Sequence, residues 1–170
     1  MPPTTLTGSE RKMIVGLAAL AVSNKPSTTF TTYSLGSCLG VAIYDPAVRV
    51  GGMLHAMLPD SSIDAVKAVT IPAMFIDTGI PALFRAAYEL GAEKHRVRIY
   101  VAGGAQILDN SGFFNIGKRN YEALTDLLLQ HNLNIHAQDV GGLVNRTMCL
   151  HLGTGRVTLK SSGHSHEILL

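Results

Sequence analysis

The sequence TYSLGSCLGVAIYDPAVRVGGMLHAMLP, residues 32–59, contains one cysteine and one histidine, each close to glycines. Two apolar runs, LGVAIYD and VRVGGMLHA, lie on either side of Asp45-Pro46, a dipeptide that is typical of a turn. We therefore expect two antiparallel strands joined at this turn. Such a hairpin would bring Cys38, at the start of the first run, beside His55 in the second.

A cysteine and a histidine side by side are the minimum apparatus for thiol catalysis. The thiolate is a strong nucleophile, and an imidazole can keep it ionised and later donate a proton. Gly36 and Gly40 flank Cys38, which predicts a tight bend at the thiol. The pattern superficially matches the nucleophile elbow of hydrolases, but an elbow is followed by a helix and here a strand follows. The alternative interpretation is structural, because a buried cysteine often packs as a small apolar side chain.

Composition limits the class of protein. The chain has 170 residues, which is the size of one domain. Charged residues make up 15% and hydrophobic residues 46%, with 17 glycines, so we expect a packed, turn-rich globular protein. The formal charge of +2 is too small to indicate a nucleic-acid surface. Cys38 and Cys149 are the only cysteines, which argues against a disulfide framework and favours a reducing cytoplasm.

The N-terminal region allows two interpretations. Residues 1–11 are polar and contain adjacent prolines, which predicts a flexible end. Next, residues 10–23 read ERKMIVGLAALAVS, and a basic patch before an apolar run is also how a secretory signal reads. The run is shorter than the ~20 apolar residues that span a bilayer. We expect a strand here and no membrane insertion.

The second half of the chain alternates helical and extended patterns. Apolar residues repeat at three- and four-residue intervals in a helix that should end at Gly91, with Thr78 as its N-cap and Pro81 in its first turn. A second helix should begin at Ile116, capped by Asn115. Strands are predicted at 96–102 and 133–140 and in a hairpin of 146–152 with 156–160. This pattern gives an alternation of helices and strands, which we expect in one domain over residues 12–161 with a flexible tail at 162–170.

Other chemically interesting residues have simpler explanations. Gly117, Lys118 and Arg119 could bind a phosphate at a helix N-terminus, which leaves an anion- or nucleotide-binding module as an alternative function. No complete phosphate-binding motif accompanies them. Cys149 lacks the histidine and glycine context of Cys38, and we predict that it packs in the core. His164 and His166 are two potential metal ligands without a third, so no metal site is predicted.

The sequence around the Cys–His pair resembles the signature of the CheD family, the bacterial chemoreceptor glutamine deamidases. The resemblance covers most of residues 13–160. Two positions depart from the family pattern, Leu54 where a polar residue is usual and Asn145 where glycine is common. The matching residues are Leu35-Gly36-Ser37-Cys38, Tyr44-Asp45-Pro46, Gly51-Gly52-Met53, His55, Met57-Leu58-Pro59, Gly103-Gly104-Ala105, Ile116-Gly117-Lys118-Arg119-Asn120 and Asp139-Val140-Gly141-Gly142.

The resemblance implies a fold and an activity. The fold would be a single α/β domain with a β-rich, mostly antiparallel, sandwich-like core and helices packed outside. The activity would be hydrolysis of glutamine side chains to glutamate in methyl-accepting chemotaxis receptors, without a cofactor. Cys38 would be the nucleophile, His55 the acid and base, and Thr32 a residue that orients the histidine.

Further expectations concern the oxyanion and the partners. A tetrahedral intermediate needs hydrogen-bond donors, and the backbone near Ser37 and Cys38 could supply them. Gly36, Gly51 and Gly52 are further candidates for this role or for shaping the site. The resemblance implies a CheC-type phosphatase as a partner. A folded but inactive relative that serves as an adaptor of chemotaxis signalling proteins is the remaining alternative.

Overall fold

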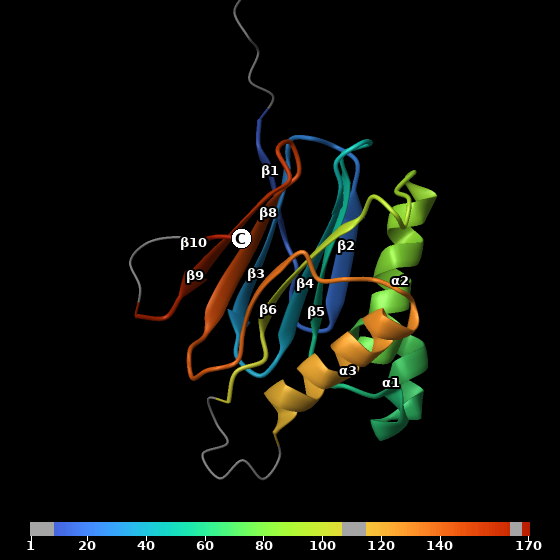
Figure 1. Ribbon diagram of the computed structural model, residues 1–170, viewed down its shortest axis with the longest axis vertical. Coiled ribbons are helices and arrows are strands. Elements are labelled where there is room, and N and C mark those ends of the chain that lie inside the picture. Colours follow the sequence, from blue (N-terminus) through green and yellow to red (C-terminus); the bar gives the residue numbers. More distant parts are fainter. Residues whose placement is uncertain (1–8, 107–114, 164–167) are drawn as a thin grey trace, which may run out of the picture.

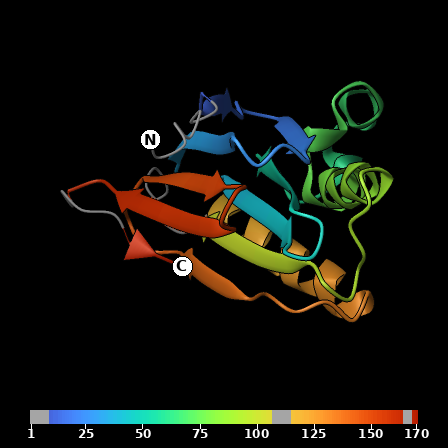
Figure 2. The ribbon, with the colours of Figure 1, turned by 90° about the horizontal axis from the view of Figure 1, so that it is seen from above.

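The computed structural model describes residues 9–106, 115–163 and 168–170. In these ranges the chain forms two five-stranded sheets that face each other, and the helices cover the outer face of one of them (Figure 1). Figure 2, seen from above, shows the same order of layers, with the helices on one side only. The first sheet contains β1 (Arg11–Ile14), β3 (Thr28–Leu35), β8 (Arg146–His151), β9 (Arg156–Ser161) and β10 (Ile168–Leu169), in that spatial order. The second contains β2 (Ala19–Ser23), β5 (Val50–Ala56), β4 (Leu39–Asp45), β6 (Arg98–Gly103) and β7 (Ala137–Val140).

Strand pairing is mostly antiparallel, as expected. Within the described residues the parallel pairs are β1 with β3 and β6 with β7. The predicted hairpin is confirmed, because β4 and β5 pair antiparallel from Leu39 opposite Ala56 to Asp45 opposite Val50. The single-domain, sandwich-like α/β architecture with helices outside is therefore the observed one.

Two apolar clusters hold the layers together. One lies between the sheets and the other between the second sheet and the helices. Strand β4 contributes side chains to both clusters, since successive side chains of a strand point to opposite faces. Val41 and Ile43 face the helices, whereas Ala42 and Tyr44 face the first sheet. All seven residues of β4 are buried for this reason.

The first helical region is divided into several elements. It comprises η1 (Ser61–Ile63), α1 (Ala65–Thr70), η2 (Pro72–Met74) and the main helix α2 (Ile76–Glu89). The predicted N-cap, Thr78, was wrong, because the helix begins two residues earlier and Phe75 occupies the cap position. The Thr78 hydroxyl instead donates to the Pro72 carbonyl, 2.6 Å away, and ties α2 to η2. Pro81 consequently lies beyond the first turn, while Gly91, with a φ of 102°, follows the helix as expected.

The second predicted helix is α3 (Ile116–Gln130). Asn115 occupies the cap position but makes no capping hydrogen bond with its side chain. Its carboxamide oxygen accepts from Nε2 of Gln106 instead. No helix in the described part of the chain is long and apolar enough to cross a membrane.

The chain ends differ in part from prediction. The apolar run after the basic patch forms β1 and β2, which confirms the strand interpretation. The fold already begins at Arg11, whose N–H donates to the Ser27 carbonyl at 2.8 Å. The tail is not flexible throughout, because β10 pairs with Thr158 and Leu159 on the open edge of β9. His164 and His166 lie outside the described residues.

Candidate active site

The two sheets contribute side chains to one buried hydrogen-bonded chain. His55, on β5 of the second sheet, is 1% exposed, and Thr32, on β3 of the first sheet, is fully buried. The Thr32 hydroxyl lies 2.7 Å from Nδ1 of His55. The same hydroxyl donates to the carbonyl of Val15 at 2.6 Å. A residue predicted from the resemblance alone thus contacts the predicted histidine across the sandwich.

These contacts determine which nitrogen of His55 carries the proton. A threonine hydroxyl has one hydrogen, and here that hydrogen goes to Val15. The hydroxyl can then only accept from His55, so Nδ1 must be protonated and Nε2 must hold the lone pair. Within the described part of the chain, Nε2 is buried and has no hydrogen-bond partner. Leaving a buried polar group unpaired costs about 1–3 kcal/mol, so this nitrogen calls for a functional explanation.

Cys38 lies at the same end and on the same face of the second sheet. It is the last residue of the bend that precedes β4, and two residues later Gly40 pairs with His55. Residues two apart share a face in extended backbone, and directly paired residues also share a face. Cys38 packs against the apolar cluster between the sheets, and His55 contacts Thr32 of the first sheet across the same space. Its exposure is intermediate, so the thiol is the accessible member of the pair.

Burial disfavours the charged form of both groups. It raises the pKa of the Cys38 thiol, and the backbone N–H of Cys38 opposes this shift more weakly. Burial also lowers the pKa of His55. Burial thus works against the ionised form of both the thiol and the imidazole.

The bend at Cys38 is held by the loop that follows β6. The carbonyl of Gly36 accepts from the Ala105 N–H at 2.8 Å, and that of Cys38 accepts from the Gly104 N–H at 2.9 Å. Gly103 has a φ of 107°, and a Cβ there would lie 2.2 Å from the Cys38 carbonyl oxygen. Only glycine allows this approach. The Gly-Gly-Ala sequence thus supports the bend at Cys38 from a distant part of the chain.

The glycines beside Cys38 act differently from the sequence prediction. The left-handed residue near the bend is Ser34, with a φ of 57°, and neither Gly36 nor Gly40 has a positive φ. Gly40 is required for space, because a Cβ there would lie 2.7 Å from a methyl group of Leu35. Strand β3 is irregular just before the bend, because its pairing with β8 shifts register between Thr32 and Leu35.

Gly51 and Gly52, candidates for shaping the site, have packing neighbours instead. A Cβ on Gly51 would lie 2.5 Å from Leu152, and one on Gly52 would lie 2.7 Å from Val22. Both glycines let core side chains approach β5 at the end remote from His55.

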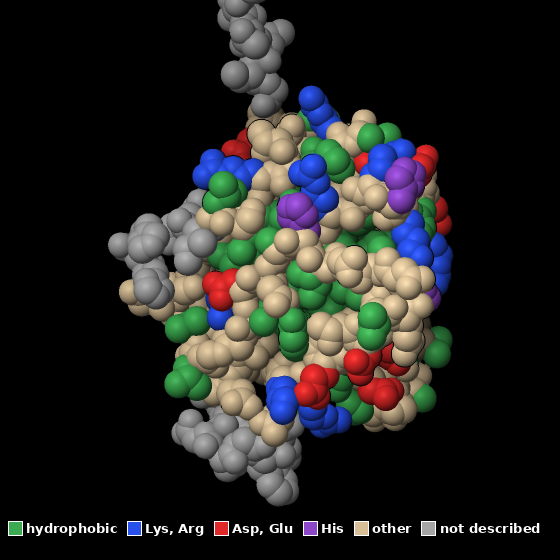
Figure 3. Space-filling model, viewed as in Figure 1, with side chains coloured by type: hydrophobic (Ala, Val, Ile, Leu, Met, Phe, Trp, Pro, Cys, Tyr) green, Lys and Arg blue, Asp and Glu red, His purple; other side chains and the backbone are tan. Residues whose placement is uncertain are grey.

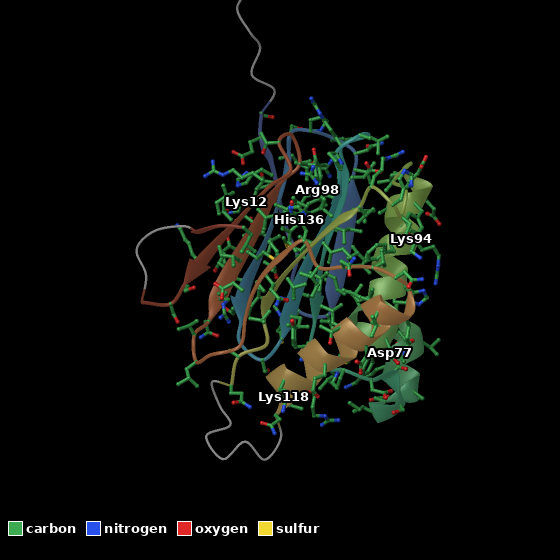
Figure 4. The ribbon with its side chains drawn as sticks, viewed as in Figure 1. Lys12, Asp77, Lys94, Arg98, Lys118 and His136 are labelled. Atoms are coloured by element: carbon green, nitrogen blue, oxygen red, sulfur yellow. The ribbon has the colours of Figure 1, made fainter. Side chains whose placement is uncertain are left out.

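The helix start proposed as an anion site also has a packing explanation. A Cβ on Gly117 would lie 2.5 Å from the carbonyl oxygens of Gly104 and Ala105, so the glycine docks α3 on the loop that supports Cys38. Lys118 lies 3.7 Å from Glu122 along the helix, and Figure 4 shows it at the start of α3. Figure 3 shows lysines and arginines in separate small groups on this face of the molecule.

Cys149 does not lie in the core, and that prediction was wrong. Along β8, Met148 and Leu150 face the space between the sheets, so Cys149 between them faces outward. Its sulfur lies 3.3 Å from the Thr31 hydroxyl and lines a hollow of about 250 Å³ on the outer face of the first sheet.

The structure adds two buried polar residues that sequence reasoning gave no role. Arg146 is 5% exposed and contacts Asp139 at 3.1 Å and the Gly103 carbonyl at 3.3 Å. Asn120 is fully buried, and its amide nitrogen lies 2.9 Å from the Ser37 carbonyl. A signal was present for Asn120, since it lies four residues before Leu124 on the apolar face of α3. A polar residue on that face needs a buried partner.

Comparison with known proteins shows which chains this one is similar to. The family model described as CheD chemotactic sensory transduction matches residues 57–161. A probable chemoreceptor glutamine deamidase CheD 1 of Syntrophus aciditrophicus is 51% identical over 151 residues, which are 89% of this chain and 94% of that protein. A probable chemoreceptor glutamine deamidase CheD of Solibacter usitatus is 43% identical over 158 residues, or 93% and 94% of the two chains. Among solved structures, a Neisseria meningitidis protein of the DUF152 family has a TM-score of 0.44 at 11% identity, over 78% of this chain and 62% of its own.

Proposed function

This chain belongs to the CheD family, and from that membership and the geometry of its site we propose that it deamidates glutamine side chains of chemoreceptors by a Cys–His thiol mechanism. The products would be glutamate and ammonia. Relatives that align over nearly their whole length are named for this reaction, which supports the substrate class.

The observation that carries the mechanism is the lone pair on Nε2 of His55. It is buried and unpaired in the described chain, and the Thr32 hydroxyl fixes its tautomer. A purely structural histidine at this position would be expected to use both nitrogens, because buried polar groups are normally paired. A general base needs an unprotonated nitrogen that faces the group from which it takes a proton. Cys38 lies at the same end of the sheet and faces the same space.

In the first half of the reaction, Nε2 takes the thiol proton as the Cys38 sulfur bonds to the carboxamide carbon of the substrate glutamine. The carbonyl π electrons move to oxygen and form the oxyanion. The protonated His55 then gives its proton to the amide nitrogen, the carbon–nitrogen bond breaks, and ammonia leaves a thioester. Burial disfavours a charged imidazole, so the proton is readily released to the leaving group.

In the second half, His55 takes a proton from water, and the resulting hydroxide attacks the thioester carbon. The carbon–sulfur bond breaks, the sulfur regains a proton from His55, and glutamate is released. Throughout both halves the Thr32 hydroxyl accepts from Nδ1 and keeps the ring oriented. Thr32 is thus a positioning residue, whereas Cys38 and His55 are catalytic.

The partner proposal rests on family membership. A CheC-type phosphatase is the signalling protein that we expect to bind this chain. Co-purification of the two proteins with and without a receptor fragment would test this expectation. Binding without deamidation would favour the adaptor alternative.

The experiment that tests the activity uses a purified cytoplasmic receptor fragment. Wild type and Cys38→Ser are incubated with it, and peptide mass spectrometry follows the conversion of glutamine to glutamate while a coupled assay follows ammonia. We expect conversion at specific glutamines by wild type only. If wild type converts no glutamine while it binds the fragment, the deamidase proposal fails.

A further inference from the structure

Asn120, on α3, hydrogen bonds to the bend that carries Cys38 and to the end of the strand that carries His55. Its amide nitrogen Nδ2 donates to the Ser37 carbonyl at 2.9 Å and to the Met57 carbonyl at 3.0 Å. Ser37 precedes the nucleophile, and Met57 follows the strand that carries His55. With two carbonyl oxygens as neighbours, the NH₂ group rather than the oxygen must face them. Both hydrogens of one buried amide thus tie the Cys38 bend to the His55 strand.

The bond to Ser37 has a consequence for the next N–H. A peptide unit is planar and trans, so the C=O of Ser37 and the N–H of Cys38 point in opposite directions. Asn120 is fully buried beneath the bend and draws the Ser37 oxygen toward the interior. The Cys38 N–H therefore points away from Asn120, and it lowers the pKa of its own thiol.

The neighbouring peptide units are fixed in the same way. The carbonyls of Gly36 and Cys38 accept from Ala105 and Gly104, so three consecutive carbonyls of the bend are anchored in the protein. Among the described residues, neither the Ser37 nor the Cys38 N–H donates to an oxygen acceptor. An oxyanion hole consists of such preorganised N–H groups beside the nucleophile. In the described part of the chain these two N–H groups are therefore available as donors next to the thiol.

We infer that Asn120 is a positioning residue that orients the Ser37–Cys38 peptide, and through it the N–H donors for the oxyanion formed on the substrate carboxamide. This inference rests on the proposed deamidation and adds a residue from α3, far from the Cys–His hairpin in sequence. Gly117 lets α3 approach closely enough for Asn120 to reach the bend, because it contacts the carbonyls of the supporting loop. Figure 1 shows the start of α3, the end of β6 and the turn between β3 and β4 at the same end of the molecule.

The test compares Asn120→Ala with a control that lowers stability elsewhere. Asp45 is buried at the opposite end of β4, where it binds Arg96 at 2.9 Å, so Asp45→Asn weakens the fold without touching the site. Loss of one oxyanion donor typically lowers kcat about 10²–10³-fold. We expect Asn120→Ala to lower kcat at least 10-fold with KM nearly unchanged, at a temperature where both variants are folded. An equal fall in Asn120→Ala and Asp45→Asn would overturn the inference.

A second measurement needs no substrate and separates this inference from the proposed function. The rate of Cys38 alkylation by iodoacetamide is followed against pH by mass spectrometry. Asn120→Ala should move the midpoint to higher pH, because the Cys38 N–H, which lowers the thiol pKa, is no longer held in place. An unchanged midpoint would refute the positioning role even if wild type proves inactive on receptors.

If Asn120→Ala does not fold, the wild-type protein can still be used to test whether the Cys38 N–H binds the oxyanion. Butyraldehyde, whose four carbons match Cα to Cδ of glutamine, adds to the thiol as the sulfur bonds to the carbonyl carbon and the thiol proton passes to oxygen. The amide proton of Cys38 should then move downfield in the NMR spectrum as it binds that oxygen. An unmoved Cys38 amide in the adduct would contradict the inference.

Discussion

Replacement of Thr32 by valine tests how the site uses its buried histidine. Valine has nearly the shape of threonine but cannot hydrogen bond, so the change removes one hydroxyl from a fully buried position. Two contacts disappear, the one to Nδ1 of His55 at 2.7 Å and the one to the Val15 carbonyl at 2.6 Å. The packing of β3 stays the same.

The expected loss of stability follows from the groups that remain. The His55 N–H and the Val15 carbonyl both lose their partner, and each buried unpaired group costs about 1–3 kcal/mol. The imidazole can shift to a new position in part, so we expect the free energy of unfolding to fall by about 2–4 kcal/mol in total. Typical domains have about 5–15 kcal/mol of stability, so the variant should still fold at 25 °C.

The expected loss of activity is smaller than the loss of the base itself. Without Thr32 the proton can move to Nε2, and the ring loses its fixed orientation. A general base contributes about 10²–10⁴ to the rate, and His55 is still present. We expect kcat to fall about 10–10²-fold.

Glutamine-to-glutamate conversion and thermal unfolding are measured on Thr32→Val and on Thr32→Ser. Serine keeps the hydroxyl, so we expect it to retain activity within about threefold of wild type. The reasoning is refuted if the valine variant matches the serine variant in both rate and stability. It is also refuted if both lose activity equally, because the methyl group rather than the hydroxyl would then be responsible.

Further predictions concern the nucleophile, the pH response and the supporting loop. Cys38→Ser should abolish conversion with little change in thermal stability. Cys149→Ser, on the outer face of the first sheet, should leave conversion intact. The opposite result would make Cys149 the nucleophile and Cys38 a structural residue. The pKa of His55 is lower in the folded chain than the usual 6.5, so as the pH falls the unfolded chain binds this proton before the folded chain does. The contribution of His55 to stability is therefore complete above pH 6.5. It is lost as the pH falls through 6.5 toward the folded value. His55→Gln should therefore show a weaker loss of denaturant midpoint between pH 7 and pH 5 than wild type, and an equal loss would show that His55 is not the group responsible. Gly103→Ala should lower kcat more than 10-fold, because its Cβ would displace the Cys38 carbonyl, while Gly16→Ala, which meets no atom within 4 Å, should be neutral; equal activity of the two variants would separate the supporting loop from catalysis.

The fold could be predicted where local patterns agree with tertiary contacts. The turn at Asp45-Pro46 and the apolar runs beside it were sufficient for the β4–β5 hairpin. The position of Thr78 was mispredicted because its hydroxyl binds a carbonyl of η2, an element with no clear periodic signal. The end of the chain was mispredicted because β10 is stabilised by the edge of β9, a contact that a local pattern does not contain.

The site shows the same division between local and distant contacts. Cys38 and His55 could be proposed because a short hairpin joins them. The contact of His55 with Thr32 needs two sheets to face each other, which spacing within one strand does not reveal. Cys149 was misplaced because a strand of alternating character has two faces, and the sequence does not say which face meets the other sheet.

Because Thr32 and His55 belong to different sheets, we expect the site to be completed late in the synthesis of the chain. Strand β3 is flanked by β1 and by β8, which is synthesised more than a hundred residues after Thr32. A ribosome-bound chain that lacks β8 and β9 contains Cys38 and His55 but only part of the first sheet, which holds the Thr32 partner of the imidazole. Catalytic competence should therefore arise only once β8 and β9 have left the ribosome and packed beside β3.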